Sequence, residues 1–295
     1  MINWYDADGH LSEDMVADFR QTLLTWYDES GRTHLPWRID KEPYHIWVSE
    51  IMLQQTQVET VIPYYERFLA ELPRVQDLAE ADEEVLLKLW SGLGYYSRIR
   101  NMQKAAQQVM ADFDGQFPTT SQDLQTLAGI GPYTAAAIAS ISFNEVVPAL
   151  DGNMFRVFAR LLKIEADIAQ PKSRKIFYDI ILPIVDPERP GDFNQAVMDL
   201  GTSLMSVKSE TLSDSPFARF NLSYQEGIEL NFPVKSKKVK QVQKFYAAII
   251  SEKNGSLAYI QRPKTGLLAN FWTYPLVEFD SWDAIYDGVS EHFEA

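Results

Sequence analysis

Cysteine is absent from the 295-residue chain, and histidine is rare. Without cysteine there is no disulfide, no thiolate nucleophile and no cysteine-ligated zinc or iron–sulfur centre. The histidines are His10, His34, His45 and His292, and no two have the spacing of a ligand pair on one helix or hairpin. The acidic first residues do not form a secretory signal, and no apolar run approaches membrane-spanning length. We therefore expect a soluble, cytoplasmic protein without a metal site built from cysteine or histidine.

Positive charge is scarce as well, because 27 Lys and Arg residues stand against 41 Asp and Glu residues and the net charge is −14. Taken alone, this argues against a nucleic-acid partner, since phosphate neutralisation needs clustered cations. Net charge describes the whole surface, whereas binding depends on one face, so the objection stays open. The hydrophobic content of 46% is enough for a core and excludes a disordered tail or a collagen-like repeat.

Residues 11–204 predict a succession of amphipathic helices with short breaks. We expect Ser12 to cap the first helix and Pro63 to lie in the first turn of a later one. Ser121 is expected to open a short helix that ends at Gly129. No convincing strand precedes residue 240, so this body is predicted to be all-α.

The pattern changes after residue 204. Residues 205–231 are polar and Ser-rich, and the basic run that follows consists of Lys235, Lys237, Lys238 and Lys240. A solvated linker between domains is favoured over a DNA-contacting or targeting patch for this run. From Gln243 short strands are predicted, beginning with 245–250 and a turn at 253–255, which is typical of the start of an α/β domain.

The strongest local motif runs from Leu127 to Ala135. Gly129 and Gly131 permit a tight hairpin with outward amide N–H groups, and the helix that starts at Pro132 points its positive end the same way. Such a site holds one phosphate without a basic side chain. The alternative is an ordinary connection between two helices with a glycine at the cap.

Two carboxylates are candidates for chemistry. Glu50 lies among apolar and aromatic residues, where its charged form is disfavoured and its pKa is raised, as a general acid requires. The alternative is an exposed helical glutamate. Asp151 follows Gly131 by twenty residues, just before a helix, and a plain N-cap is its alternative.

Two further segments fit contact with nucleic-acid bases. Residues 49–58 carry three glutamines whose amides can hydrogen-bond base edges or enter a stack. Residues 92–101 place Tyr95 and Tyr96 beside Arg98 and Arg100. Such aromatic side chains can insert into a duplex while the arginines contact phosphates nearby. The alternative is that the tyrosines pack at the edge of the hydrophobic core.

Together these segments resemble the helix-hairpin-helix DNA glycosylases, and within them the adenine-specific mismatch glycosylases of the MutY type. The resemblance covers residues 11–276. Its motifs are LPWR (35–38), SEIMLQQTQV (49–58), GLGYYSR (92–98), GIGPYTA (129–135), LDGN (150–153) and FNQ (193–195). It implies a mainly α fold, with a two-lobed glycosylase body over 1–231, a linker over 232–242 and a truncated α/β Nudix-like domain over 243–295.

The resemblance also implies roles for single residues. Glu50 is similar to the acid that protonates N7 of a flipped adenine, and Asp151 to the carboxylate that stabilises the oxocarbenium ion. Tyr133 and Asn153 match positions that arrange the sugar and Asp151. The residues that match the adenine pocket are Trp37, Arg38 and Gln195. Those that match the wedge inserted into the base stack beside the opposing base are Gln55 and Tyr95. The residues expected to contact DNA phosphates are Gly129, Gly131, Tyr133, Thr134 and Arg98.

The implied partner is duplex DNA with adenine opposite 8-oxoguanine or guanine, bound by a monomer. Related bifunctional enzymes place a lysine where this chain has Tyr133, so base excision without efficient strand cleavage is expected. The alternatives are an endonuclease III-like glycosylase–lyase and a non-catalytic binder of distorted duplexes. An active Nudix hydrolase is disfavoured because its Glu-rich helix pattern is missing.

The chain departs from the family at the segment that usually binds a four-iron four-sulfur cluster. The aligned positions hold Met205, Leu212, Ser215 and Asn221, so the remnant over 205–221 is expected to be held by packing of Met205, Leu212 and Phe217. No cofactor is expected, and only a monovalent cation at the hairpin is left open. Residues 265–272 resemble the start of the Nudix-like domain, most of which is missing, and the preference for 8-oxoguanine over guanine stays open.

Overall fold

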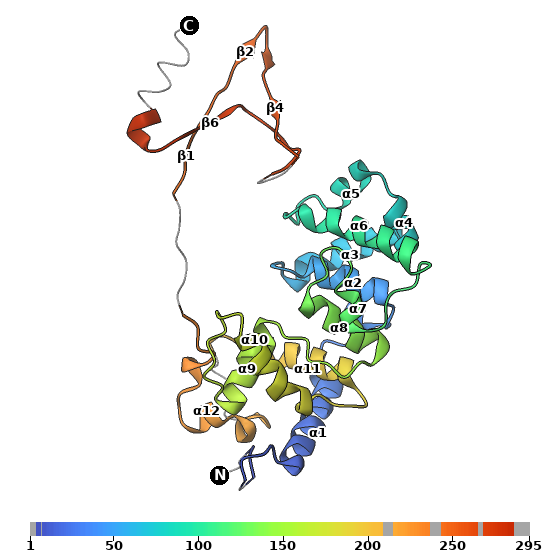
Figure 1. Ribbon diagram of the computed structural model, residues 1–295, viewed down its shortest axis with the longest axis vertical. Coiled ribbons are helices and arrows are strands. Elements are labelled where there is room, and N and C mark those ends of the chain that lie inside the picture. Colours follow the sequence, from blue (N-terminus) through green and yellow to red (C-terminus); the bar gives the residue numbers. More distant parts are fainter. Residues whose placement is uncertain (1–3, 7, 209–214, 237–242, 265–267, 286–295) are drawn as a thin grey trace. The chain divides into compact units, whose positions relative to one another are not determined.

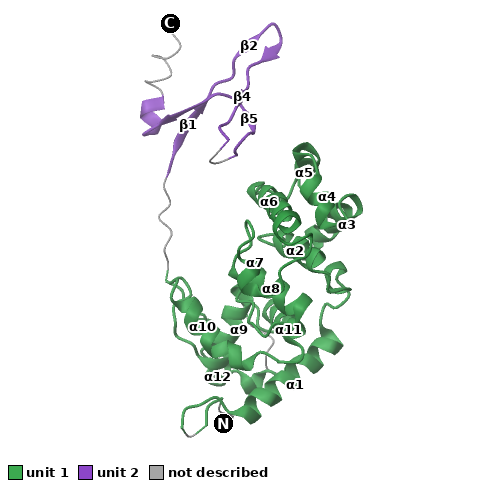
Figure 2. Cartoon of the chain, turned by 45° about the vertical axis from the view of Figure 1, so that its right-hand side comes forward, with its two compact units in different colours: residues 1–236 green, residues 237–295 purple. Residues whose placement is uncertain are grey.

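The computed structural model describes residues 4–6, 8–208, 215–236, 243–264 and 268–285. The chain divides into two compact units, Met1–Ser236 and Lys237–Ala295 (Figure 2). Within the described residues, no helix is long and apolar enough to cross a membrane. Lys237, Lys238 and Lys240 of the expected basic linker lie outside the described residues.

The first unit is helical, which confirms the prediction of a mainly α fold (Figure 1). Its α-helices are α1 (Glu13–Ser30), α2 (Pro43–Met52), α3 (Val58–Glu71), α4 (Val75–Glu80), α5 (Glu83–Leu89), α6 (Ser97–Asp112), α7 (Ser121–Leu124), α8 (Pro132–Phe143), α9 (Gly152–Leu162), α10 (Ser173–Ile181), α11 (Pro190–Thr202) and α12 (Leu222–Gln225). Short 3-10 helices cover Pro36–Arg38, Leu182–Ile184, Ala218–Phe220 and Glu229–Asn231.

Two hydrophobic cores lie inside this unit. One is built by α2 to α8, and the other by α1 and α9 to α12, as the two groups of helices in Figure 1 show. Helix α11 contacts α8 of the first group and α1 and α9 of the second. A Cβ at Gly191 on α11 would lie 2.7 Å from the Cα atom of Ile141 on α8, so glycine permits the close crossing that joins the two lobes.

Several helix ends follow the sequence signals. The Ser12 hydroxyl accepts a hydrogen bond from the Met15 amide at the start of α1, and Pro132 is the first residue of α8. The prediction for Pro63 is wrong, because α3 begins at Val58 and Pro63 lies inside the helix. There it has no N–H to donate to the carbonyl group one turn earlier.

The short helix α7 also differs from the prediction. It begins at Ser121 as expected, with Thr120 as the cap that accepts the Asp123 amide, but it ends at Leu124, ahead of Gly129. The polar segment after residue 204 contains short helices that its composition did not predict. Asn221 begins α12 by accepting the amide of Tyr224.

The second unit contains β1 (Phe245–Ala248), β2 (Glu252–Lys253), β3 (Ser256–Leu257), β4 (Ile260–Gln261), β5 (Trp272–Thr273) and β6 (Leu276–Phe279). The antiparallel pairs are β1 with β6, β2 with β3 and β4 with β5. Asn254 and Gly255 have the positive φ angles of a two-residue hairpin turn, as expected at this position.

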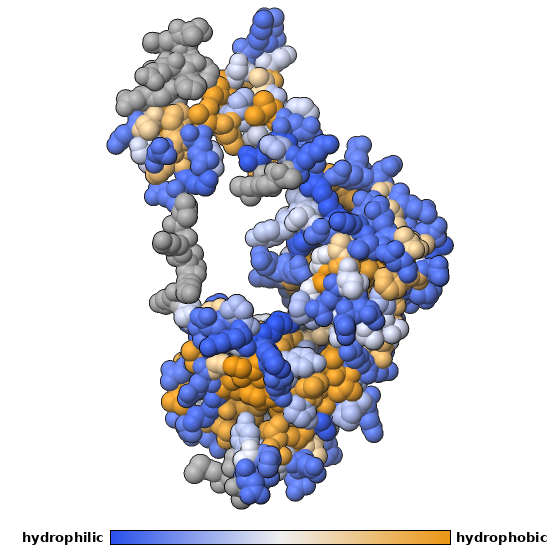
Figure 3. Space-filling view, in the orientation of Figure 1, coloured by the Kyte–Doolittle hydropathy of each residue, from blue (hydrophilic) through white to orange (hydrophobic). Residues whose placement is uncertain are grey.

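The large apolar side chains of the second unit are mostly at its surface, as Figure 3 shows for the face in view. Trp272 and Ile250 are each 66% exposed. None of the described residues of this unit is fully buried. The assignment of residues 243–295 to a lesion-recognition domain stays a prediction.

Candidate active site

A pocket of about 220 Å³ receives side chains from both lobes of the first unit. It unites seven of the residues singled out from the sequence, which are Trp37, Arg38, Glu50, Tyr133, Asp151, Asn153 and Gln195. They come from five segments of the chain: the 3-10 helix at 36–38 and helices α2, α8, α9 and α11. The two candidate carboxylates therefore line one pocket, although they are far apart in sequence.

Glu50 lies on α2 and is only 7% exposed. The Tyr133 hydroxyl donates a hydrogen bond of 2.6 Å to its Oε2 atom. Burial raises the pKa of Glu50 to about 7, against the opposing effect of the Tyr133 hydrogen bond, while the nearby charge of Asp151 raises it further. A carboxyl group with this pKa is partly protonated at neutral pH and can act as a general acid.

Asp151 has the N-cap position considered for it from the sequence, and its role in chemistry stays a prediction. It is the N-cap of α9, with Oδ1 accepting the Met154 amide at 2.7 Å, and it also lines the pocket. Its other oxygen, Oδ2, accepts a hydrogen bond of 2.8 Å from Nδ2 of Asn153. Burial raises the pKa of Asp151, and the hydrogen bonds from Met154 and Asn153 oppose that rise.

Asn153 is itself held by contacts that the sequence did not reveal. Its Oδ1 accepts a hydrogen bond of 2.6 Å from Arg156, which also donates to the carbonyl oxygens of Gly201 and Met205. A Cβ at Gly201 would lie 2.8 Å from the Cβ of Asn153. The side chain that holds Asp151 is thus fixed by hydrogen bonds on one side and close packing on the other.

The wall of the pocket expected to receive adenine carries a buried ion-pair cluster. Arg38 donates hydrogen bonds of 2.6 and 3.1 Å to the two carboxylate oxygens of Asp199, and Arg32 donates to the same group. Burial acts to raise the pKa of Asp199, but the hydrogen bonds from Arg38 and Arg32 hold it below its usual value. Sequence reasoning assigned no site role to Asp199 or Arg32, since nothing local indicates this pairing.

Gln55 and Tyr95 do not line the pocket. Both lie on loops, both have positive φ angles, and Tyr95 is 66% exposed. Positive φ is uncommon for residues other than glycine. Exposed side chains on such loops are available to a large ligand, so the wedge role of these two residues stays a prediction.

Arg98 does not have the position expected of a phosphate ligand. Its two terminal nitrogens donate to four main-chain carbonyl groups, those of Ile51, Gln54, Leu93 and Gly94. The carbonyl group of Ile51 lies in the last turn of α2, and the other three belong to the loops that carry Gln55 and Tyr95. Arg98 is therefore a positioning residue that joins the two loops, in place of the phosphate contact predicted from the sequence.

The hairpin between α7 and α8 has the predicted backbone. Gly129 has a φ of 76°, and a Cβ there would lie 2.8 Å from the Cβ of Asn101. Gly131 is the N-cap of α8 and has open space beside it. The Thr134 side chain is buried and Tyr133 is bonded to Glu50, so only their main-chain groups remain for a phosphate. A phosphate and a monovalent cation at this hairpin stay predictions.

The described residues of the segment 205–221, which the resemblance aligns with a cluster-binding segment, are held by packing and by an arginine. Met205 and Phe217 are fully buried, and Phe217 packs edge-on against Trp26 with ring centroids 5.5 Å apart. Arg160 is 2% exposed and donates to the carbonyl groups of Met205, Ser206, Val207, Glu229 and Phe232. Leu212 lies outside the described residues.

The residue types that the resemblance aligns with cluster ligands do not fit an iron–sulfur centre. Asn221 is buried and its Oδ1 accepts hydrogen bonds from Ser223 and Tyr224, and the chain supplies no thiolate. In the described part of the chain, no three His, Asp or Glu side chains are grouped to hold a metal ion.

Comparison with known proteins places these features in a family context. Residues 48–182 match the family model of the HhH-GPD superfamily base excision DNA repair proteins. The chain is 37% identical to adenine DNA glycosylase of Mus musculus, over 92% of this chain and 63% of the relative, so it spans less than two thirds of that protein. It is 35% identical to adenine DNA glycosylase of Buchnera aphidicola subsp. Acyrthosiphon pisum, over 91% of this chain and 73% of the relative.

Solved structures resemble the same region. A thermostable thymine-DNA glycosylase superposes with a TM-score of 0.64 at 22% identity, over 72% of this chain and 98% of the other. A non-covalent endonuclease III–DNA complex gives a TM-score of 0.59 at 17% identity, over 72% and 97%. At such identities the likeness concerns the fold alone, and the helical body has the fold of these glycosylases.

Proposed function

The chain belongs to the adenine DNA glycosylase family, and from this premise we propose that it hydrolyses the N-glycosidic bond of adenine mispaired with 8-oxoguanine or guanine in duplex DNA. The observation that carries the proposal is the placement of Glu50, Tyr133 and Asp151 around one pocket. A base inside the helical stack cannot reach side chains as buried as Glu50, so in this proposal the target nucleotide is flipped out of the duplex.

Glu50 supplies the proton for the leaving group. With a pKa of about 7, a substantial fraction of the carboxyl groups is protonated at neutral pH, and the proton passes to N7 of the adenine. As the bond between C1′ and N9 breaks, its electron pair goes to the base. The neutral base then leaves, because protonation has cancelled the negative charge that it would otherwise carry.

Asp151 stabilises the sugar that remains. Loss of the base leaves an oxocarbenium ion, and an ionised carboxylate on the sugar side offsets its positive charge. Asn153 holds that carboxylate by a hydrogen bond to Oδ2, which favours the ionised form. Water then adds at C1′ and loses its proton to a carboxylate, which completes the hydrolysis.

Tyr133 supports hydrolysis without strand cleavage. A lyase needs an amine that forms a Schiff base with the sugar, and the hydroxyl group of Tyr133 is instead bonded to Glu50. We therefore propose a monofunctional glycosylase that leaves the DNA backbone intact.

The distribution of charge is compatible with DNA binding despite the net charge of −14. Residues 85–111 and 124–144 contain no Asp or Glu, and the first of these stretches contains Lys88, Arg98, Arg100 and Lys104. These stretches include the Tyr95 loop and the hairpin. The acidic residues are thus absent from the segments proposed to approach the phosphates, where they would repel DNA.

The test is release of adenine from a labelled duplex that contains adenine opposite 8-oxoguanine, followed by alkali to cut at the abasic site. The wild type should give strand breaks only after alkali, and Glu50→Gln should give almost none. The control is Glu59→Gln, a change at an exposed residue of α3, which should match the wild type. Undiminished breaks with Glu50→Gln would refute the proposed acid. A borohydride-trapped adduct would indicate a lyase instead, and duplex binding without adenine release would indicate a binding module.

A further inference from the structure

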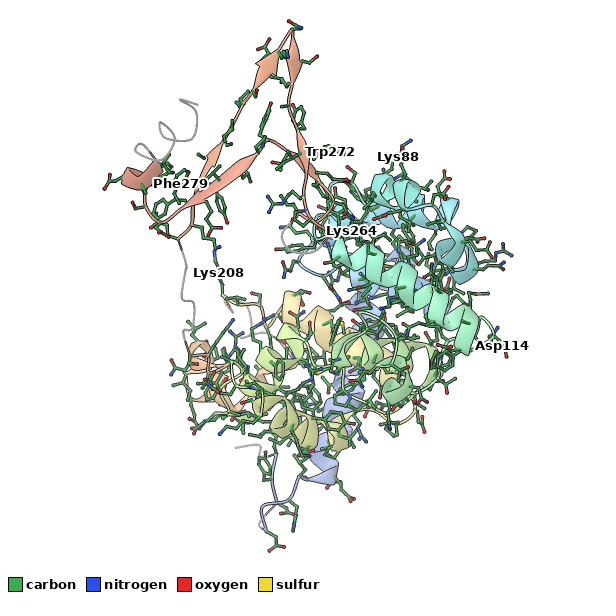
Figure 4. The ribbon with its side chains drawn as sticks, turned by 45° about the horizontal axis from the view of Figure 1, so that its top comes forward. Lys88, Asp114, Lys208, Lys264, Trp272 and Phe279 are labelled. Atoms are coloured by element: carbon green, nitrogen blue, oxygen red, sulfur yellow. The ribbon has the colours of Figure 1, made fainter. Side chains whose placement is uncertain are left out.

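A second hollow lies on the first unit, between helices α3 and α5. It has a volume of about 550 Å³, and its lining includes Tyr64, Arg67, Val85, Lys88 and Ser91. It shares no lining residue with the candidate active site. Figure 4 shows Lys88 on α5 at the outer surface of the body. We call this hollow the α3–α5 groove.

The groove presents two cations without carboxylate partners. Two other arginines of α4 to α6 and their connections are paired with carboxylates, Arg74 with Asp77 and Arg100 with Glu83. Arg67 and Lys88 are exposed, and neither forms an ion pair with any residue that the structure describes. In a chain with an excess of 14 negative charges, two such cations that line one groove indicate a site for an anionic ligand.

The side chain of Arg67 is held in place. Its guanidinium group lies over the Tyr64 ring, 4.7 Å from the centroid. Among the described residues no hydrogen bond or ion pair of this guanidinium group is found, so its N–H groups are available to a charged acceptor such as a phosphate. One carboxylate, that of Glu71 at the end of α3, also lines the groove. The residues that line the groove therefore carry a net charge of +1.

The groove is tied to the loop that carries Tyr95. The Tyr64 hydroxyl donates a hydrogen bond of 2.9 Å to the carbonyl group of Ser91. The next residue, Gly92, has a φ of 102°, and a Cβ there would overlap the Tyr64 hydroxyl. A ligand bound beside Tyr64 is thus held at a fixed place relative to the loop that is proposed to enter the duplex.

We propose that the α3–α5 groove binds a backbone phosphate of the duplex through Arg67 and Lys88. This inference rests on the proposed function, because the ligand is the same DNA that brings adenine to the active site. The phosphate contact adds affinity without reading sequence. It also fixes the position of the Tyr95 loop on the DNA, since Tyr64 lies in both the groove and the anchor of that loop.

The test measures duplex affinity as a function of salt, with an uncleavable adenine analogue opposite 8-oxoguanine. Each phosphate contact contributes about 0.9 to the slope of log affinity against log salt concentration. The double variant with Arg67→Gln and Lys88→Gln should make this negative slope less steep by about 0.9, the value of one phosphate contact. Arg67→Lys, which keeps the charge, should retain most of the wild-type slope. Lys172→Gln, an exposed lysine at the start of α10, is the matched control and should leave the slope unchanged.

The outcomes separate the two proposals. An unchanged slope in the double variant, in a protein whose wild type releases adenine, would overturn the groove proposal alone. A less steep slope in a protein that releases no adenine would retain the groove and overturn the proposed excision. Equal thermal melting temperatures of the variants and the wild type verify that these surface changes leave the fold intact.

Discussion

Replacing Gly201 with alanine is predicted to slow adenine excision without touching either carboxylate. The added Cβ would lie 2.8 Å from the Cβ of Asn153 and 3.2 Å from its Cγ and Oδ1. Real Cβ atoms do not tolerate the shorter distance, so Asn153 must move. Its Nδ2 then loses the 2.8 Å hydrogen bond to Oδ2 of Asp151.

The size of the effect follows from the bond that is lost. A hydrogen bond to a charged group contributes about 1.5–3 kcal/mol, and each 1.36 kcal/mol in the barrier is tenfold in rate, so the excision rate should fall about 10-fold to 150-fold. Loss of the bond also raises the pKa of Asp151 further, because the ionised form loses a donor. The acidic limb of the pH–rate profile should therefore move to higher pH.

The assay is single-turnover excision with excess enzyme, applied to a double-mutant cycle. Gly201→Ala should slow the wild type but add little to Asn153→Ala, since both changes act through the same side chain. Excision by Gly201→Ala at the wild-type rate would refute the reasoning. The reasoning would also be refuted if Gly201→Ala slowed the Asn153→Ala variant by as large a factor as it slows the wild type.

Further predictions concern the acid, the cluster-free segment and the ion-pair cluster. Tyr133→Phe removes a donor that favours the ionised Glu50, so the pKa of Glu50 should rise and the alkaline fall of the excision rate should move to higher pH, as a pH series would reveal. Arg160→Met leaves buried carbonyl groups without their donor and should lower the free energy of unfolding by about 3 kcal/mol or more, measured by urea denaturation. The pKa of Asp199 is lowered in the folded state, so its contribution to stability is complete above its unfolded pKa of about 4 and is lost as the pH falls through the lower folded value. Acid titration of the melting temperature should show this loss, and Asp199→Asn should remove it.

The carboxylates and the hairpin were predictable because their signals are local. Apolar and aromatic neighbours around Glu50 indicated burial, and burial raises its pKa. Asp151 precedes a helical stripe, so its N-cap role could be expected, and Gly129 and Gly131 predicted the hairpin backbone.

The partners of these residues were not predictable from local patterns. Arg38 donates a hydrogen bond to Asp199, which is 161 positions away in the sequence. Gly201 lies close to Asn153 only because α11 packs against α9. Arg98 was misjudged because an arginine beside tyrosines looks the same whether it binds phosphate or main-chain carbonyl groups. Pro63 was misplaced because proline is typical of a first helical turn, whereas tertiary packing tolerates it inside α3.

A crystal structure of the protein bound to a duplex with an uncleavable adenine nucleotide opposite 8-oxoguanine would locate the base relative to both carboxylates. We predict that the adenine is extruded into the pocket, with N7 within hydrogen-bond distance of Glu50, about 2.6–3.2 Å, and with C1′ facing Asp151. An adenine that remains stacked, or that binds with only one of the two carboxylates beside its nucleoside, would contradict the proposed mechanism.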